Sequence, residues 1–274
     1  MNIMFCGDSH AEDGILIATL SLLKNTSAPL HLYILTMQAE GYEAFDEQAF
    51  NLIKKIIKEK DSNNTAELID CTDLFKKEPP RANMETRFTP YAMLRLFADQ
   101  IPQIPDRILY LDDDIIVRKD ISDFYNQDLT NVELVGVLDF WGRFFFHNIH
   151  SHKTFDYLNS GVLLLNMDEI KKTRLFAKVR EKMSDKKMLL PDQSALNKLA
   201  TEKRIAPRCY NEQYRLHPDT KIQHFTTSFR FKPYFHTLTV KPWDVERVHS
   251  VLKLHEYDDL LKQYTELKPL LKQH

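Results

Sequence analysis

The stretch that decides the fold is Arg107-Ile108-Leu109-Tyr110-Leu111-Asp112-Asp113-Asp114-Ile115-Ile116-Val117. Its apolar and β-branched residues predict a buried strand, but three acids interrupt it. Carboxylates are seldom buried unless they are paired or bind a cation. Because alternate side chains of an extended chain share a face, Asp112 and Asp114 can point at one metal ion while Asp113 points away. Oxygen ligands suit Mn²⁺ or Mg²⁺, which can hold a diphosphate; an acidic turn at a strand end is the alternative.

The order of the expected elements predicts the class of fold. Apolar runs and helical spacing favour strands at 3–6, 30–35, 66–69, 107–111, 134–138 and 162–166, and helices at 15–23, 43–60 and 91–97. This alternation is typical of an α/β fold with a doubly wound, mostly parallel sheet and helices on both faces. Ligands of such sheets bind beyond the carboxyl ends of the strands. Four acids fall at that edge: Asp8, Asp112, Asp114 and Asp139.

Composition and targeting signals narrow the class of protein. A formal net charge of −2 gives no reason to expect a nucleic acid as partner. Three widely spaced cysteines do not form a metal knuckle. The sequence shows neither a basic and then apolar leader nor an apolar run of the roughly 20 residues that span a bilayer. We therefore expect a cytoplasmic protein with at most peripheral membrane contact, whose oligomeric state is not predicted.

The segment from 140 to 157 loses its periodicity and is rich in aromatic and histidine residues. Flat aromatic rings suit sugar faces, so a lid or a platform for an acceptor is one interpretation of this loop. His147, His150 and His152 raise the alternative of a zinc site, but no cysteine or further acid accompanies them.

Five blocks, taken in their order and spacing, resemble glycosyltransferase family 8, in particular its bacterial galactosyl- and glucosyltransferases. The blocks are 91–96, 110–114, 159–166, 191–197, and a late histidine followed by 241–243. The resemblance runs over roughly residues 2–260. It implies a GT-A type fold and a retaining enzyme that uses a UDP-sugar and a divalent metal.

The resemblance also implies roles for particular side chains. Asp112 and Asp114 match the family's metal-binding acids, and Asp8 would read the uracil edge of the nucleotide, unless it is only a turn acid or helix cap. The other residues expected to bind substrate are Arg95, Asp113, Asp139, Asn159 and Lys241. Of these, Lys241 would contact the diphosphate as a point charge. Arg95 could equally be a surface or sheet-packing arginine.

Asp192 and Gln193 are the residues that the resemblance places closest to the chemistry. The acid would grip sugar hydroxyls, and the glutamine would lie on the face opposite the leaving group. Because a neutral amide is a poor nucleophile, we expect a front-face mechanism in which the Gln193 carbonyl stabilises developing positive charge. The same residues could also simply begin a helix after Pro191.

The third metal ligand has two candidates. His224 follows the strand-like residues 221–223, which suits the family pattern, but it stands far ahead of Lys241. His236 lies nearer to Lys241 but lacks an apolar lead-in. We favour His224 and keep His236 as its rival, with residues 225–235 as an insertion in the first case.

The sequence as a whole favours a hexosyltransferase that moves glucose or galactose from a UDP-sugar to a saccharide or glycan, including one carried by a protein or a cell surface. Residues 1–243 would form the catalytic domain, with a donor half at about 1–120 and an acceptor half at about 121–243. Residues 244–274 would form a helical extension packed on the core. The alternatives are a nucleotide-sugar-binding module without turnover and a two-metal nucleotidyl- or phosphotransferase.

Overall fold

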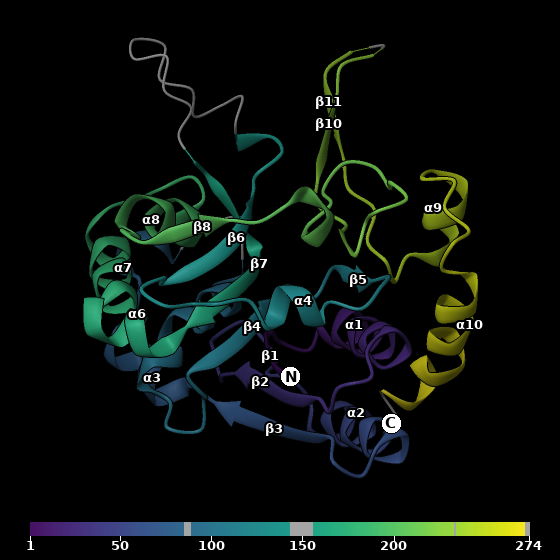
Figure 1. Cartoon of the computed structure of the whole chain (residues 1–274), viewed down its shortest axis with the longest axis horizontal. Helices are drawn as coiled ribbons and strands as arrows, with labels where there is room; N and C mark the ends of the chain where they lie inside the picture. Colours follow the sequence, from purple (N-terminus) through teal and green to yellow (C-terminus); the bar gives the residue numbers. More distant parts are fainter. Residues whose placement is uncertain (85–88, 143–155, 233, 272–274) are drawn as a thin grey trace.

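A central sheet organises the computed structural model, which describes residues 1–84, 89–142, 156–232 and 234–271 (Figure 1). Its seven strands follow the order β3-β2-β1-β4-β7-β6-β8. Their bounds are β1 Asn2–Cys6, β2 His31–Thr36, β3 Thr65–Asp70, β4 Arg107–Leu111, β6 Leu134–Leu138, β7 Leu158–Asn166 and β8 Lys203–Ile205. The pairs β1–β2, β2–β3, β1–β4 and β6–β8 are parallel, whereas β7 runs antiparallel to β4 and β6. The expected α/β fold with a mostly parallel sheet is confirmed.

Helices cover both faces of this sheet and bury two cores. The α-helices are α1 Glu12–Asn25, α2 Glu47–Lys60, α3 Thr72–Lys77, α4 Ser122–Tyr125, α6 Met167–Thr173, α7 Leu175–Asp185, α8 Pro191–Leu199, α9 Val245–Ser250 and α10 Asp258–Leu267. The 3₁₀ helices are η1 Arg81–Asn83, η2 Pro90–Gln100, η3 Arg208–Tyr210 and η4 Lys268–Leu270. Alternation along β1 explains the two cores: Ile3 and Phe5 face α1, while Met4 faces η2.

Two short ladders lie beside the main sheet. β5, Ile115–Val117, pairs antiparallel with β9, Ile222–His224, so that Ile115 stands opposite His224. β10, Ser228–Arg230, pairs with β11, His236–Leu238, and this hairpin projects from the body of the molecule (Figure 1). The first ladder brings a segment that follows the acids against a segment more than a hundred residues later in the chain.

Some element boundaries differ from those expected. Residues 159–161, expected to form a turn, lie inside β7, whose first eight residues are all buried. The helix expected from Pro90 is a 3₁₀ helix. α2 begins only after Asp46, because that carboxylate accepts hydrogen bonds from the amides of Gln48 and Ala49.

The last helices pack against the first. The Tyr264 hydroxyl in α10 donates to Asp13 Oδ1 in α1 at 2.7 Å, and Leu260 and Leu261 join the core around α1. No helix in the part of the chain that the structure describes is both long and apolar enough to cross a bilayer.

Candidate functional site

Two acids and one histidine converge where β4 ends. Asp112 and Asp114 lie between β4 and β5, and the β5–β9 ladder brings His224 against them. His224 Nε2 lies 2.9 Å from Asp114 Oδ1 and 3.6 Å from Asp112 Oδ2, and the three ligand atoms all lie within 4.8 Å of one another. Carboxylate and imidazole ligands together suit Mn²⁺ and related divalent ions. Among the described residues this group includes His224 and not its rival His236, which lies in the projecting hairpin.

Asn211 orients the His224 ring. His224 Nδ1 lies 3.1 Å from Asn211 Oδ1, and both side chains are almost fully buried. Because the amide oxygen can only accept, Nδ1 carries a proton; once Nε2 gives up its own proton, the neutral ring has its lone pair on Nε2, on the side of the two acids. This is the tautomer that a metal-binding histidine needs.

The absence of a side chain at Gly161 keeps the space between Asp112 and His224 open. A Cβ atom built there would lie 2.2 Å from His224 Cε1 and 2.5 Å from Asp112 Oδ2. The Gly161 carbonyl accepts a hydrogen bond from the Asp112 amide at 2.8 Å, which fixes the start of the acidic segment. The close approach of β7 therefore requires a glycine at this position.

Charge compensation in this cluster is strong. Lys241 donates to Asp114 Oδ2 and, at 3.4 Å, to the Phe225 carbonyl. Burial opposes ionisation, but the ion pairs with Lys241 and His224 hold the pKa of Asp114 well below its usual range. The same contacts raise the pKa of His224 and of Lys241 against the effect of burial. Burial and the charge of Asp114 raise the pKa of the half-buried Asp113.

Tyr110 and Arg95 hold Oδ1 of Asp112, the carboxylate oxygen that does not face His224. Oδ1 accepts a 2.6 Å hydrogen bond from the Tyr110 hydroxyl and lies 3.4 Å from Arg95 Nη1. The Arg95 guanidinium stacks over the Tyr110 ring at 4.3 Å. These contacts turn Oδ2 of Asp112 toward His224.

Arg95 is a buried side chain under the site, with only 3% of its surface exposed. It pairs with Asp192 and donates to the Ser160 carbonyl at 2.8 Å. The alternative of a surface arginine is therefore wrong, and the buried guanidinium links Asp112, after β4, to Asp192 of α8.

A hydrogen-bond network holds the remaining expected side chains together. Gln193 Oε1 accepts from the Ser160 amide at 3.0 Å and from its hydroxyl at 3.2 Å, while Gln193 Nε2 donates to Asp139 Oδ2 at 3.1 Å. Asn159 donates to the same oxygen at 3.0 Å. Asn159 Oδ1 accepts from Gly161 N at 3.0 Å and Asn211 Nδ2 at 2.9 Å, which joins this network to His224.

Asp8 lies at the end of β1, and only 3% of its surface is exposed. Oδ1 accepts from the His10 amide at 3.1 Å. Oδ2 is buried and has no hydrogen-bond partner among the described residues. A buried carboxylate oxygen in this state is suited to an N–H donor from a ligand.

The segment after Lys241 is docked on α1. A Cβ atom at Gly14 would lie 2.4 Å from the Asp113 carbonyl oxygen and 2.7 Å from the Trp243 ring. The helix, the acidic segment and the indole thus meet where only a glycine fits. This contact sets the position from which Lys241 reaches Asp114.

Three polar residues of the site were not found from the sequence: Tyr110, Ser160 and Asn211. The first two stood inside quoted blocks, and only their contacts reveal what they do. Asn211 lies in an irregular segment after η3, where no periodic pattern or motif marks it. Most of the aromatic loop expected at 140–157 as a lid or platform, residues 143–155 with His147, His150 and His152, lies outside the described residues.

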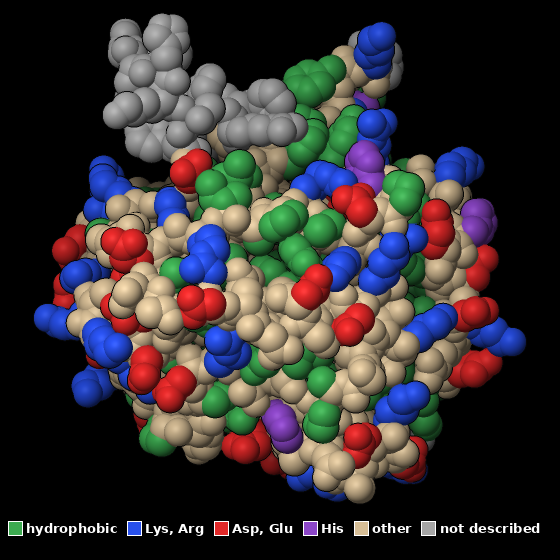
Figure 2. All heavy atoms as spheres, viewed as in Figure 1, with side chains coloured by type: hydrophobic (Ala, Val, Ile, Leu, Met, Phe, Trp, Pro, Cys, Tyr) green, Lys and Arg blue, Asp and Glu red, His purple; other side chains and the backbone are tan. Residues whose placement is uncertain are grey.

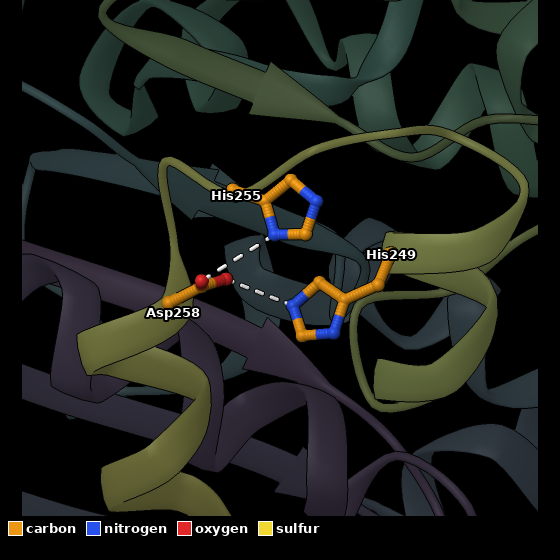
Figure 3. Close-up of side chains that lie close together, drawn as sticks. All are labelled: His249, His255 and Asp258. Atoms are coloured by element: carbon orange, nitrogen blue, oxygen red, sulfur yellow. Dashed lines mark hydrogen bonds and ion pairs between the residues drawn. The ribbon is translucent and has the colours of Figure 1, made fainter.

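A second group of possible metal ligands lies at the C-terminal helices (Figure 3). His249 Nε2 is 2.8 Å from Asp258 Oδ1, and His255 Nδ1 is 3.4 Å from Asp258 Oδ2. Their side chains are 34%, 65% and 52% exposed, respectively for His249, His255 and Asp258. Since water reaches all three and one carboxylate already pairs with both rings, we treat the group as a surface ion pair and assign it no ligand.

Comparison with known proteins finds the same family over nearly the whole chain. The model of the family described as Glycosyl transferase family 8 matches residues 2–246. A putative glycosyltransferase of Haemophilus influenzae is 26% identical over 212 residues, which are 72% of this chain and 58% of that protein. Lipopolysaccharide 1,3-galactosyltransferase of Salmonella typhimurium is 25% identical over 218 residues, 76% of this chain and 61% of that protein. The chain thus spans less than two thirds of the length of these relatives.

Solved structures show the same fold. The galactosyltransferase LgtC, crystallised with donor and acceptor sugar analogues, superposes with a TM-score of 0.67 at 17% identity, covering 98% of this chain and 100% of that one. The glycosyltransferase GlyE of Streptococcus pneumoniae superposes with a TM-score of 0.62 at 20% identity, covering 97% of this chain and 64% of that one.

Proposed function

The chain belongs to glycosyl transferase family 8, and on that premise we propose that it is a metal-dependent, retaining hexosyltransferase. Its donor would be UDP-glucose or UDP-galactose, and its acceptor a saccharide or glycan. The observation that carries the proposal is the convergence of Asp112, Asp114 and His224, with Lys241 beside them. Arg95 links Asp112 to Asp192, the neighbour of Gln193 in α8. We assign the catalytic part to residues 1–243 and a helical extension to 244–274.

The donor set fits a divalent ion. The contact of Nδ1 with Asn211 leaves Nε2 of a neutral His224 ring to bind a cation, and Gly161 leaves room between His224 and Asp112. A Mn²⁺ or Mg²⁺ ion bound there would draw negative charge onto a leaving diphosphate. Lys241 supplies a further positive charge next to the same acids, as a phosphate contact requires.

The remaining residues would bind and orient the donor. Asp8 offers a buried acceptor oxygen for the N–H of a uracil ring. Asp192 would hold sugar hydroxyls. Asp139 accepts hydrogen bonds from Asn159 and Gln193, so Asp139 and Asn159 would act by fixing the position of Gln193. We assign Arg95 the role of positioning Asp112 and Asp192.

Gln193 would face the anomeric carbon from the side opposite UDP. Ser160 donates twice to Gln193 Oε1 and so fixes the direction of that dipole. Because an amide is a poor nucleophile, the acceptor hydroxyl would enter from the leaving-group side and pass its proton to the leaving phosphate oxygen. Gln193 would stabilise the positive charge that develops on the sugar.

The test measures UDP release from UDP-glucose and UDP-galactose with Mn²⁺, with and without saccharide acceptors. Asp114→Asn is expected to lose release, since it removes a ligand charge. Asp259→Asn, which changes a carboxylate with 95% exposure, is the matched control and is expected to keep it. Metal-dependent UDP binding without release from any donor would favour the binding module. Release of inorganic diphosphate would favour the nucleotidyltransferase.

A further inference from the structure

The β10–β11 hairpin carries an exposed aromatic tip. Phe231, Tyr234 and Phe235 are 65%, 70% and 61% exposed. Figure 2 shows apolar and basic side chains along this hairpin, standing clear of the body of the molecule. Several large rings exposed together mark a surface that binds something, because isolated apolar residues are common but clusters are not.

A regular ladder joins the two strands of this hairpin. The three pairs of its ladder join Ser228 to Leu238, Phe229 to Thr237 and Arg230 to His236. At its base the Phe229 ring packs edge-on against Trp141 at 5.0 Å. Toward the tip, the centroid of the Phe235 ring lies 5.9 Å from that of Phe229 and 5.6 Å from that of Phe231. The exposed rings are therefore held in place before any partner binds, which lowers the entropic cost of binding.

The charge around the rings has one sign. Arg230 and Lys232 belong to the hairpin, and the sequence between His224 and Asp244 contains no aspartate or glutamate. Aromatic side chains flanked by lysine and arginine suit the boundary between lipid headgroups and acyl chains, where rings enter the apolar layer and cations meet anionic phosphates. A projecting tip also differs from the concave sites that bind free sugars.

The hairpin is joined directly to the candidate site. It connects His224, at the end of β9, with Lys241. A pocket of about 280 Å³ at its base is lined by Arg230, Leu238 and Val251 and borders His224. A partner that binds the tip of the hairpin would therefore also fix the orientation of the candidate site relative to that partner.

We propose that the β10–β11 hairpin inserts its aromatic tip into the surface of an anionic lipid bilayer and thereby presents the site to a saccharide carried on a membrane lipid. The part concerning the acceptor rests on the proposed glycosyltransferase function. The part concerning membrane binding does not, and the two are tested by separate measurements.

The first measurement is co-sedimentation of the full chain with vesicles of phosphatidylcholine, with or without phosphatidylglycerol. The wild type is expected to bind the anionic vesicles and to lose binding at high salt. The double variant Phe231→Ser/Phe235→Ser is expected to bind at least tenfold more weakly, with its circular dichroism spectrum unchanged. Leu189→Ser is the matched control: Leu189 is 79% exposed and lies in the segment between α7 and α8, so this variant is expected to bind vesicles as the wild type does.

A second measurement reports the depth of the tip. Tyr234→Trp adds a fluorophore at the hairpin, and its emission is expected to shift to shorter wavelength with anionic vesicles. No sedimentation of the wild type, equal binding by the double variant, or a shift caused by soluble saccharides instead of vesicles would overturn the proposal. If the protein binds vesicles but releases no UDP from any donor, the proposed enzymatic function is wrong and the proposed membrane contact is supported.

Discussion

Replacing Gly161 by alanine is expected to weaken metal binding at the candidate site strongly without unfolding the protein. Gly161 lies in the extended strand β7, and among the described glycines only Gly41 has a positive φ, so the backbone at 161 accepts an L-residue. The added Cβ, however, would lie 2.2 Å from His224 Cε1 and 2.5 Å from Asp112 Oδ2.

The size of the effect follows from these distances. Non-bonded carbons at optimal separation are about 3.5–4.0 Å apart, so the His224 ring has to move by more than about 1 Å. Metal–ligand distances tolerate only about 0.2 Å. Since losing a hydrogen bond behind one ligand already costs about 10- to 100-fold in affinity, displacing a ligand should cost at least ~100-fold, or ~2.7 kcal/mol.

The assay is calorimetric titration of Mn²⁺ into the protein in the presence of UDP, alongside thermal unfolding. Gly136→Ala is the matched control: Gly136 lies in the neighbouring strand β6, and its Cβ would meet only flexible leucine side chains, at 2.9 Å from Leu163 Cδ2. The control is expected to bind Mn²⁺ as the wild type does. A folded Gly161→Ala protein whose affinity stays within about threefold of the wild type would refute the assigned ligand geometry.

Other substitutions separate the roles of single residues. Asp8→Asn is expected to weaken UDP binding about tenfold, because a hydrogen bond to a charged group is lost, while calorimetry should find diphosphate binding with Mn²⁺ unchanged. Asn211→Leu is expected to lower Mn²⁺ affinity about 10- to 100-fold through His224; equal affinity would contradict the role of Asn211. Glu78→Gln tests acid stability. Partial burial acts to raise the pKa of Glu78, but the hydrogen bond and charge of the Arg180 guanidinium outweigh it and hold this pKa below 4.5 in the folded state. This stability is therefore present above about pH 4.5 and lost as the pH falls; the variant should flatten that part of a urea-unfolding series, and an unchanged slope would exclude the pair.

The fold was predictable because its signals are local. Apolar runs marked β1, β2, β4, β6 and β7, and helical spacing marked α1 and α2 within a few residues. The direction of β7 was not predictable, because a fully buried strand has the same apolar pattern in both orientations. Asn159-Ser160-Gly161 suggested a turn since asparagine and glycine favour turns, but here partners across the site satisfy the Asn159 amide inside a strand.

The candidate site was only partly predictable. Asp112 and Asp114 follow from one short pattern in which acids interrupt a strand. His224 and His236 could not be separated with certainty, because the pairing of β5 with β9 joins segments distant in the sequence. Asn211 gave no signal, since its contacts to His224 and Asn159 exist only after the chain has folded.

The ladder between β5 and β9 also has a consequence for synthesis of the protein. Asp112, Asp113 and Asp114 leave the ribosome long before His224, which this ladder brings against Asp114, and before Lys241, which also pairs with Asp114. Until then three neighbouring carboxylates repel one another, and of the three Arg95 pairs with Asp112 alone. At about 5–20 residues per second, the hundred residues between them take several seconds or more to translate. In the nascent N-terminal half, the segment 112–114 should therefore stay unpaired with β9. A divalent ion would gain its full set of ligands only after His224 has been synthesised and has paired with this segment.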